Sequence, residues 1–73
     1  MTAAAEMQKL NPRQKRALYK ALRGRGLAQT FHVDAKINKV YAEFVYDSGS
    51  RVAHHIMLGQ RGRIVYHEIQ KIN

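Results

Sequence analysis

Apolar residues near the N-terminus recur at helical spacing. They fall one and four residues apart, which places them on a single stripe of a helix, and they are Ala17, Leu18, Ala21 and Leu22. Basic residues take much of the remaining circumference, and they are Arg13, Arg16, Lys20 and Arg23. The pattern predicts an amphipathic helix whose outer side is basic.

Local signals predict where this helix begins and ends. Asn11 is a favoured N-cap, Pro12 suits the first helical position, and Gln14 stands three residues after the cap, as in a capping box. Gly24 can adopt the left-handed conformation that ends many helices. We therefore expect a helix from Pro12 to about Arg23. A shorter helix over residues 3–10, capped by Thr2, is expected ahead of it.

From Leu27 the apolar period changes from helical spacing to two, which is typical of half-buried strands. The predicted strands cover residues 27–33, 38–46, 51–58 and 64–69. In the first, residues 27, 29, 31 and 33 share a side, and in the second Val40, Ala42, Phe44 and Tyr46 share a face. Asp47-Ser48-Gly49-Ser50 predicts a tight hairpin turn, and Gly59-Gln60-Arg61-Gly62 predicts a second. The later strands should therefore form an antiparallel meander.

Together these elements predict an α+β fold, in which one or two N-terminal helices pack on a three- or four-stranded antiparallel β-sheet. With 73 residues the chain is expected to be a single domain, residues 1–73. Its basic helical segment covers residues 1–26 and its antiparallel sheet residues 27–73.

The charge balance adds a clue to the partner. Thirteen Lys and Arg oppose five Asp and Glu, for a net charge of +8. Residues 1–26 hold seven basic residues and one acidic residue, or +6, and the rest of the chain carries +2. Such a field attracts phosphate backbones, anionic membrane surfaces and acidic protein patches. Charge alone does not choose among them.

The chain has no cysteine, so disulfides and thiolate ligands are excluded. No apolar run approaches the length of a signal peptide core or of a membrane span. We therefore expect an intracellular, soluble protein. A membrane-surface role is disfavoured, because the helix stripe is rich in Ala and lacks Trp and Phe.

Catalytic and metal-binding patterns are weak. Ser48 and Ser50 lie in a predicted turn without the surroundings of a nucleophile. His54 and His55 are neighbours on a strand and point to opposite faces, so an ideal strand cannot direct both at one ion. The tyrosines and phenylalanines mostly follow the core pattern, which disfavours an exposed platform for stacking bases. We expect no enzymatic activity, no cofactor and no metal site.

The candidate binding residues are chosen by charge. They are Arg13, Arg16, Lys20, Arg23 and Arg25 on the helix and its continuation, with Arg61 and Arg63 at the second hairpin tip. A solvated polar face and an ordinary surface turn are the alternatives.

The whole chain, from Met-Thr-Ala-Ala-Ala-Glu-Met-Gln-Lys-Leu-Asn-Pro-Arg-Gln-Lys-Arg through Tyr-His-Glu-Ile-Gln-Lys-Ile-Asn, resembles the small transcription regulator of a lytic Xanthomonas bacteriophage. The resemblance implies a protein of the host bacterial cytoplasm that binds host RNA polymerase, near the N-terminal part of the beta-prime subunit and the RNA exit channel. It implies inhibition of initiation at host promoters and antitermination during elongation. No short motif assigns roles to residues. An apolar groove between helix and sheet could equally take a segment of the polymerase, and a strand edge could pair with one.

The sequence leaves two function classes open. One is a regulator that binds RNA polymerase, and the other is a module that binds DNA or RNA directly through the basic helix. The two differ in their response to salt, because phosphate contacts weaken steeply as salt rises.

Overall fold

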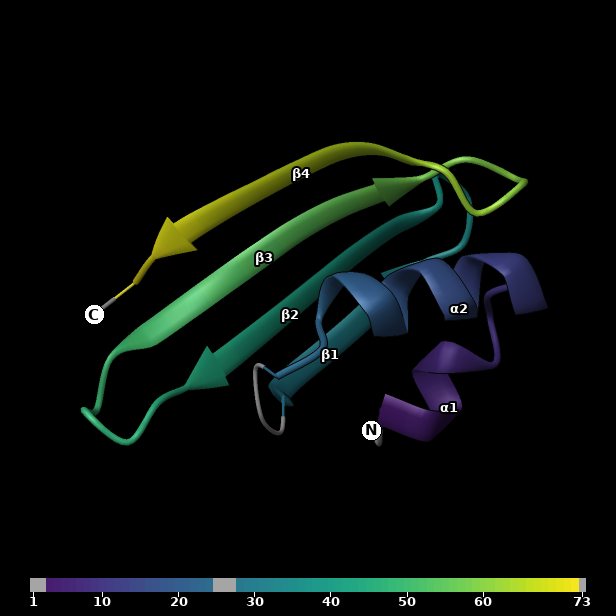
Figure 1. The fold of residues 1–73 in the computed structure, drawn as a ribbon. Helices are drawn as coiled ribbons and strands as arrows, with labels where there is room; N and C mark the ends of the chain where they lie inside the picture. The colour runs from purple at the N-terminus through teal and green to yellow at the C-terminus, as the bar shows by residue number, and fades with distance from the viewer. Residues whose placement is uncertain (1–2, 25–27, 73) are drawn as a thin grey trace.

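The computed structural model describes residues 3–24 and 28–72. Two helices precede four strands along the chain. In order they are α1 (Ala3–Met7), α2 (Pro12–Ala21), β1 (Ala28–Asp34), β2 (Lys39–Val45), β3 (Arg51–Leu58) and β4 (Ile64–Lys71). The strands form one antiparallel sheet in the order β1-β2-β3-β4, and both helices lie on the same side of it (Figure 1). The predicted α+β fold with a meander is confirmed.

The start of α2 follows its predicted signals. The backbone N–H of Gln14 donates to the Asn11 side chain at 2.9 Å, and the Gln14 side chain accepts from the Asn11 N–H at 3.0 Å. This is the reciprocal arrangement of a capping box. The helix ends at Ala21, two residues earlier than predicted, and Leu22 caps it by donating its N–H to the Leu18 carbonyl at 3.0 Å.

The first helix is shorter than the sequence predicts. It ends at Met7 instead of near residue 10, and the Leu10 N–H donates to the Met7 carbonyl at 3.0 Å, which continues the chain as a turn. Its expected cap, Thr2, lies outside the described residues. Met7 and Leu10 are both buried, so this segment belongs to the core.

Burial follows the predicted alternation in β2, but β3 buries the adjacent residues Ala53 and His54, and β4 is exposed at every residue after Ile64. Val40, Ala42 and Phe44 are buried on one face of β2, as expected. In β1, Gln29 was expected on the core side but is exposed, because the β1–β2 register shifts between Ala28 and Thr30. Leu27, the expected start of that strand, lies outside the described residues.

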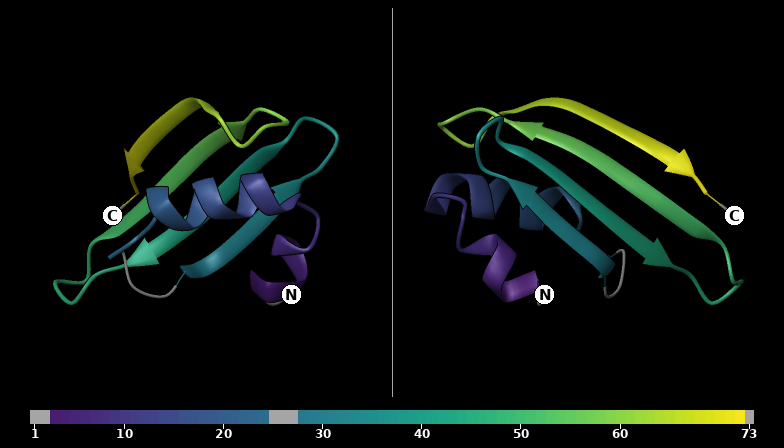
Figure 2. Two further views of the ribbon diagram at one scale, coloured as in Figure 1. Left: turned by 45° about the vertical axis from the view of Figure 1, so that its right-hand side comes forward. Right: turned by 180° about the vertical axis from the view of Figure 1, so that it is seen from behind.

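The core fills the space between the helices and one face of the sheet. Leu18 of α2 is buried in a cluster with residues from the first three strands, and these are Val33, Val40, Ile56 and Leu58. Seen from behind, the other face of the sheet stands in front of both helices (Figure 2, right). Among the described residues, no helix is long and apolar enough to cross a membrane.

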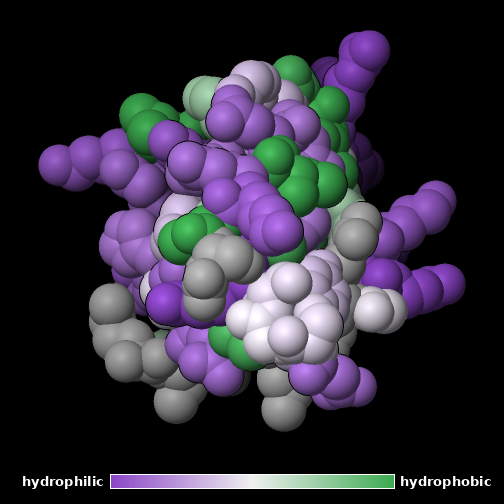
Figure 3. Space-filling view, turned by 90° about the vertical axis from the view of Figure 1, so that its left-hand side faces the viewer, coloured by the Kyte–Doolittle hydropathy of each residue, from purple (hydrophilic) through white to green (hydrophobic). Residues whose placement is uncertain are grey.

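The fourth strand lies at the edge of the sheet, on the side away from α1 (Figures 1 and 2). It runs to Lys71, two residues further than predicted. Ile64 packs against the core, but the large apolar side chains that follow it are exposed: Val65 by 62%, Ile69 by 54% and Tyr66 by 46%. Figure 3 shows apolar side chains reaching the surface among hydrophilic ones. Strand β4 therefore contributes little to the core.

Candidate binding surface

The basic residues predicted on the second helix lie on its outer side. Arg13, Arg16 and Lys20 are exposed along α2, and Arg23 is exposed just beyond its end. They are separated by three or four residues, which aligns them along the helix. None of the five acidic residues of the chain lies within α2.

The β3–β4 turn is held against the N-terminal end of this helix. The Asn11 amide donates to the Gln60 carbonyl at 2.8 Å, and the Gln14 amide donates to the Gly59 carbonyl at 3.2 Å. Gln14 is buried, so the second bond lies partly away from water. A partly buried hydrogen bond is costly to break, because breaking it leaves a polar group without a partner and away from water. The turn is therefore docked on the helix.

Gly62 makes the closest approach between the turn and the helix. A β-carbon at this position would lie 2.4 Å from the carbonyl oxygen of Arg13, and the residue has a φ of +83°. Both facts require glycine here. Arg61 and Arg63 flank Gly62, so the turn that carries these two arginines meets the backbone of Arg13 at the glycine between them.

The structure thus joins the two patches that the sequence predicts separately. We call the joined region the basic surface, and its residues are Arg13, Arg16, Lys20, Arg23, Arg61 and Arg63. The hairpin tip meets the helix at Arg13, and the other helix residues extend away from that junction. Arg25, the remaining predicted residue, lies outside the described residues.

The basic surface is not neutralised by acidic side chains. Within residues 3–24 and 28–72, the ion pairs involve Lys9 and His32 with Glu6, and Arg51 with Glu43. None of these basic residues belongs to the basic surface. The charges of that surface therefore remain available to an anionic partner.

Glu6 has a structural role that the sequence pattern did not reveal. Its carboxylate is buried and accepts the Val33 N–H at 2.9 Å, while it contacts the Lys9 ammonium at 2.8 Å and His32 Nδ1 at 3.1 Å. The hydrogen bond from Lys9, followed by that from Val33, holds the pKa of Glu6 below its usual value. Glu6 therefore ties α1 to the outer edge of β1.

The histidines of β3 and β4 lie in different environments. His54 is completely buried and its Nδ1 lies 2.9 Å from Nε2 of the exposed His67, while His55 faces the opposite side of β3. The described part of the chain holds no group of three or more His, Cys, Asp or Glu residues that suits a metal ion.

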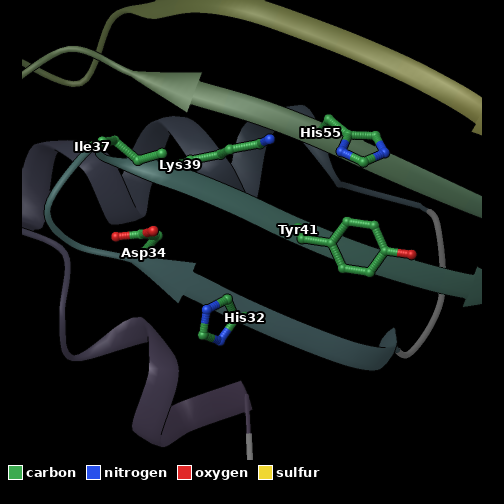
Figure 4. Close-up of a pocket in the computed structure, with 6 residues that line it drawn as sticks. All are labelled: His32, Asp34, Ile37, Lys39, Tyr41 and His55. Atoms are coloured by element: carbon green, nitrogen blue, oxygen red, sulfur yellow. The ribbon is translucent and has the colours of Figure 1, made fainter.

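A shallow hollow lies on the sheet face opposite the helices (Figure 4). It is lined by His32, Asp34, Ile37, Lys39, Tyr41 and His55. The rings of Tyr41 and His55 meet edge to face with centroids 5.0 Å apart. The volume of about 280 Å³ is just below the range of about 300–1,000 Å³ usual for small-molecule sites. Its mixed charges favour no ligand class.

Comparison with known proteins assigns no relative to the chain. No protein-family model, no curated protein sequence and no solved structure matches it.

Proposed function

We propose that this chain is a phage-encoded regulator that acts in the host bacterial cytoplasm by binding RNA polymerase and not by catalysis. In this proposal it inhibits initiation at host promoters and lets elongating polymerase pass terminators. The contact is the N-terminal part of the beta-prime subunit, near the RNA exit channel. The resemblance of the whole chain suggests the identity of the partner, and the basic surface supplies the physical means of binding.

The observation that carries the proposal is the junction at Arg13. A turn that carries Arg61 and Arg63 is fixed on the helix that carries the other basic residues. Basic side chains on two docked elements present their charge with less ordering cost than the same residues on separate flexible segments. An acidic patch on a large protein would be both attracted to this surface and oriented by it.

A second candidate function is direct binding of DNA or RNA. Among the described residues, no acidic side chain forms an ion pair with the basic surface. This favours binding of nucleic acid, because arginines without an acidic partner attract phosphates and displace the counterions of the nucleic acid. The salt dependence separates the two functions. A chain that makes six phosphate contacts would lose roughly a thousandfold in affinity between low and moderate salt.

The test is capture of purified, nuclease-treated core polymerase and holoenzyme by the tagged chain across a salt series, with free DNA and RNA as parallel ligands. Capture that survives moderate salt supports the regulator, and it is followed by assays of promoter block and terminator read-through. Absence of polymerase capture, with tight and salt-sensitive binding of nucleic acid, supports the second candidate.

Two matched variants test whether the basic surface is the contact. Arg16→Glu with Lys20→Glu reverses two charges on α2. Lys36→Glu with Lys39→Glu reverses two charges in and beside the β1–β2 turn, outside the basic surface and away from β4. Both pairs lower the net charge equally, so long-range steering falls equally. We expect the first pair to weaken polymerase binding by about tenfold or more and the second pair to weaken it much less. Equal losses would show that only net charge matters.

A further inference from the structure

The two edge strands of the sheet, β1 and β4, differ in how well they are protected from pairing with another chain. A sheet edge presents unpaired backbone N–H and C=O groups, and proteins usually cover or distort such edges to prevent pairing with another chain. Strand β1 has both protections. It contacts α1 and has an irregular register between Ala28 and Thr30, and its Val33 N–H donates to the buried Glu6 carboxylate.

Strand β4 has neither protection along most of its length. No described strand pairs with its outer side, and its register with β3 is regular from Tyr66 to Lys71. Its irregularity is confined to the beginning, beside the β3–β4 turn. An extended stretch of backbone is therefore left open.

The register identifies which backbone groups point outward. Ile72 donates its N–H to the Arg51 carbonyl at 2.8 Å, and these two residues continue the β3–β4 pairing. In an antiparallel pair, residues that exchange hydrogen bonds alternate with residues that do not. The N–H and C=O groups of His67, Ile69 and Lys71 therefore point away from β3, toward the open side.

The side chains along this edge also suit an added strand. Ile69 lies opposite His54, on the core face of the sheet, and Tyr66 lies opposite Met57, on the other face. Both are large, partly apolar and about half exposed. A strand added at β4 would find an apolar neighbour on each face, which is how strand addition combines backbone hydrogen bonds with side-chain contacts.

The charges favour a foreign acidic strand over a second copy of this chain. Two copies would each bring a net charge of +8 to the contact. Arg61 and Arg63 of the basic surface immediately precede β4, so the open edge and the basic surface are continuous. In an extended segment, apolar residues at alternate positions would match the open edge of β4. Acidic residues near one end of the segment would match the basic surface.

We infer that β4 is a docking edge that accepts an extended, acidic segment of a protein partner as a fifth strand. The inference rests on the proposed function, since it assigns the mode by which RNA polymerase would be bound. The basic surface attracts the segment, and the edge fixes its register through the outward groups of His67, Ile69 and Lys71.

The experiment compares polymerase capture by the wild-type chain, Ile69→Pro and Ile69→Ala. Proline removes the outward N–H at a position where an edge strand tolerates it, whereas alanine removes only the side chain. We expect proline to weaken capture at least tenfold more than alanine does. Equal capture by the two variants would overturn the docking edge while leaving polymerase binding intact. No capture by the wild-type chain would overturn the proposed function and this inference with it.

Hydrogen exchange gives a readout that needs no variant. The amides are labelled in the wild-type complex with core polymerase, and the chain is released before its amides are measured. We expect new protection at His67, Ile69 and Lys71, while Glu68 and Gln70, which already pair with β3, serve as controls. Unchanged exchange at the outward amides would contradict the inference. Self-association of the free chain that Ile69→Pro abolishes would show that the edge accepts a second copy instead.

Discussion

Gly62 touches the backbone of Arg13 so closely that a β-carbon there would lie 2.4 Å from the Arg13 carbonyl oxygen and 2.7 Å from its carbonyl carbon. This contact connects the second hairpin turn with the first turn of α2. Neither atom of Arg13 can move without disturbing the start of the helix. The relative position of the two halves of the basic surface therefore depends on one glycine.

Replacing Gly62 with alanine should destabilise the fold more than the same change at Gly49. Both residues have a positive φ, of +83° and +86°, so each variant bears backbone strain of about 1 kcal/mol. A β-carbon at Gly49 would meet nothing within 4 Å, whereas one at Gly62 meets the Arg13 backbone. We expect losses in the free energy of unfolding of about 1 kcal/mol for Gly49→Ala and about 3 kcal/mol for Gly62→Ala. Equal losses in urea denaturation would show that the turn moves freely from the helix.

The two hydrogen-bonding roles of Asn11 can be separated by substitution. Its side-chain oxygen caps α2 through the Gln14 N–H, and its amide donates to the Gln60 carbonyl. Asn11→Ala removes both bonds and should lower stability by about 1 kcal/mol or more. Asn11→Asp retains the cap but loses the donor, so its free energy of unfolding should fall between those of the wild type and the alanine variant. Amide chemical shifts of residues 59–62 report the docking directly, and they should change in both variants.

Tyr41 and Tyr66, on the sheet face opposite the helices, should both have raised pKa values, but for different physical reasons. A hydrogen bond to Glu68 is the largest cause that raises the pKa of Tyr66, whereas desolvation is the largest for Tyr41, followed by the charge of Glu43. Glu68→Gln should therefore lower the pKa of Tyr66 and leave that of Tyr41 unchanged. Glu43→Gln should lower the pKa of Tyr41 only in part. Ultraviolet titration with Tyr→Phe variants as references measures both, and a shift of both tyrosines in either variant would contradict this assignment.

Local signals predicted most of the fold. The capping box at Asn11 and Gln14 depends on neighbouring residues alone, and the alternation in β2 reflects a strand with one buried face. The shorter course of α1, the exposure of Gln29 and the early end of α2 were not predicted. Each depends on tertiary packing or on a register shift, neither of which a local pattern encodes.

The candidate surface was predicted as residues but not as a site. Charge identified Arg13, Arg61 and Arg63, yet nothing in the sequence placed the hairpin tip at Gly62 against Arg13, 49 residues earlier in the chain. The sequence indicated Gly62 only as a turn residue, whereas the structure shows that the closeness of the Arg13 backbone also requires glycine at this position. The role of Glu6 was missed because an acid in a short helix looks like an exposed residue until its partners in the sheet are known.

The buried carboxylate of Glu6 should make the protein sensitive to acid. The pKa of Glu6 is below its usual value in the folded protein, so ionised Glu6 favours folding. Its contribution is complete above the pKa of the unfolded chain, about 4.3, and is lost as the pH falls from there through the lower pKa of the folded state. Glu6→Gln keeps the size and an acceptor for the Val33 N–H but removes the charge that Lys9 contacts.

We therefore expect Glu6→Gln to be less stable than the wild type near pH 7, and the difference should shrink as the pH falls below about 4. Asp47→Asn is the control, because it removes one carboxylate from the exposed β2–β3 turn. Urea denaturation of the three proteins from pH 7 to pH 3 measures the effect. A Glu6→Gln deficit that stays constant across this range would mean that the variant acts through packing or hydrogen bonding and not through the charge of Glu6. The ion pair with Lys9 would then have no part in holding α1 to the sheet.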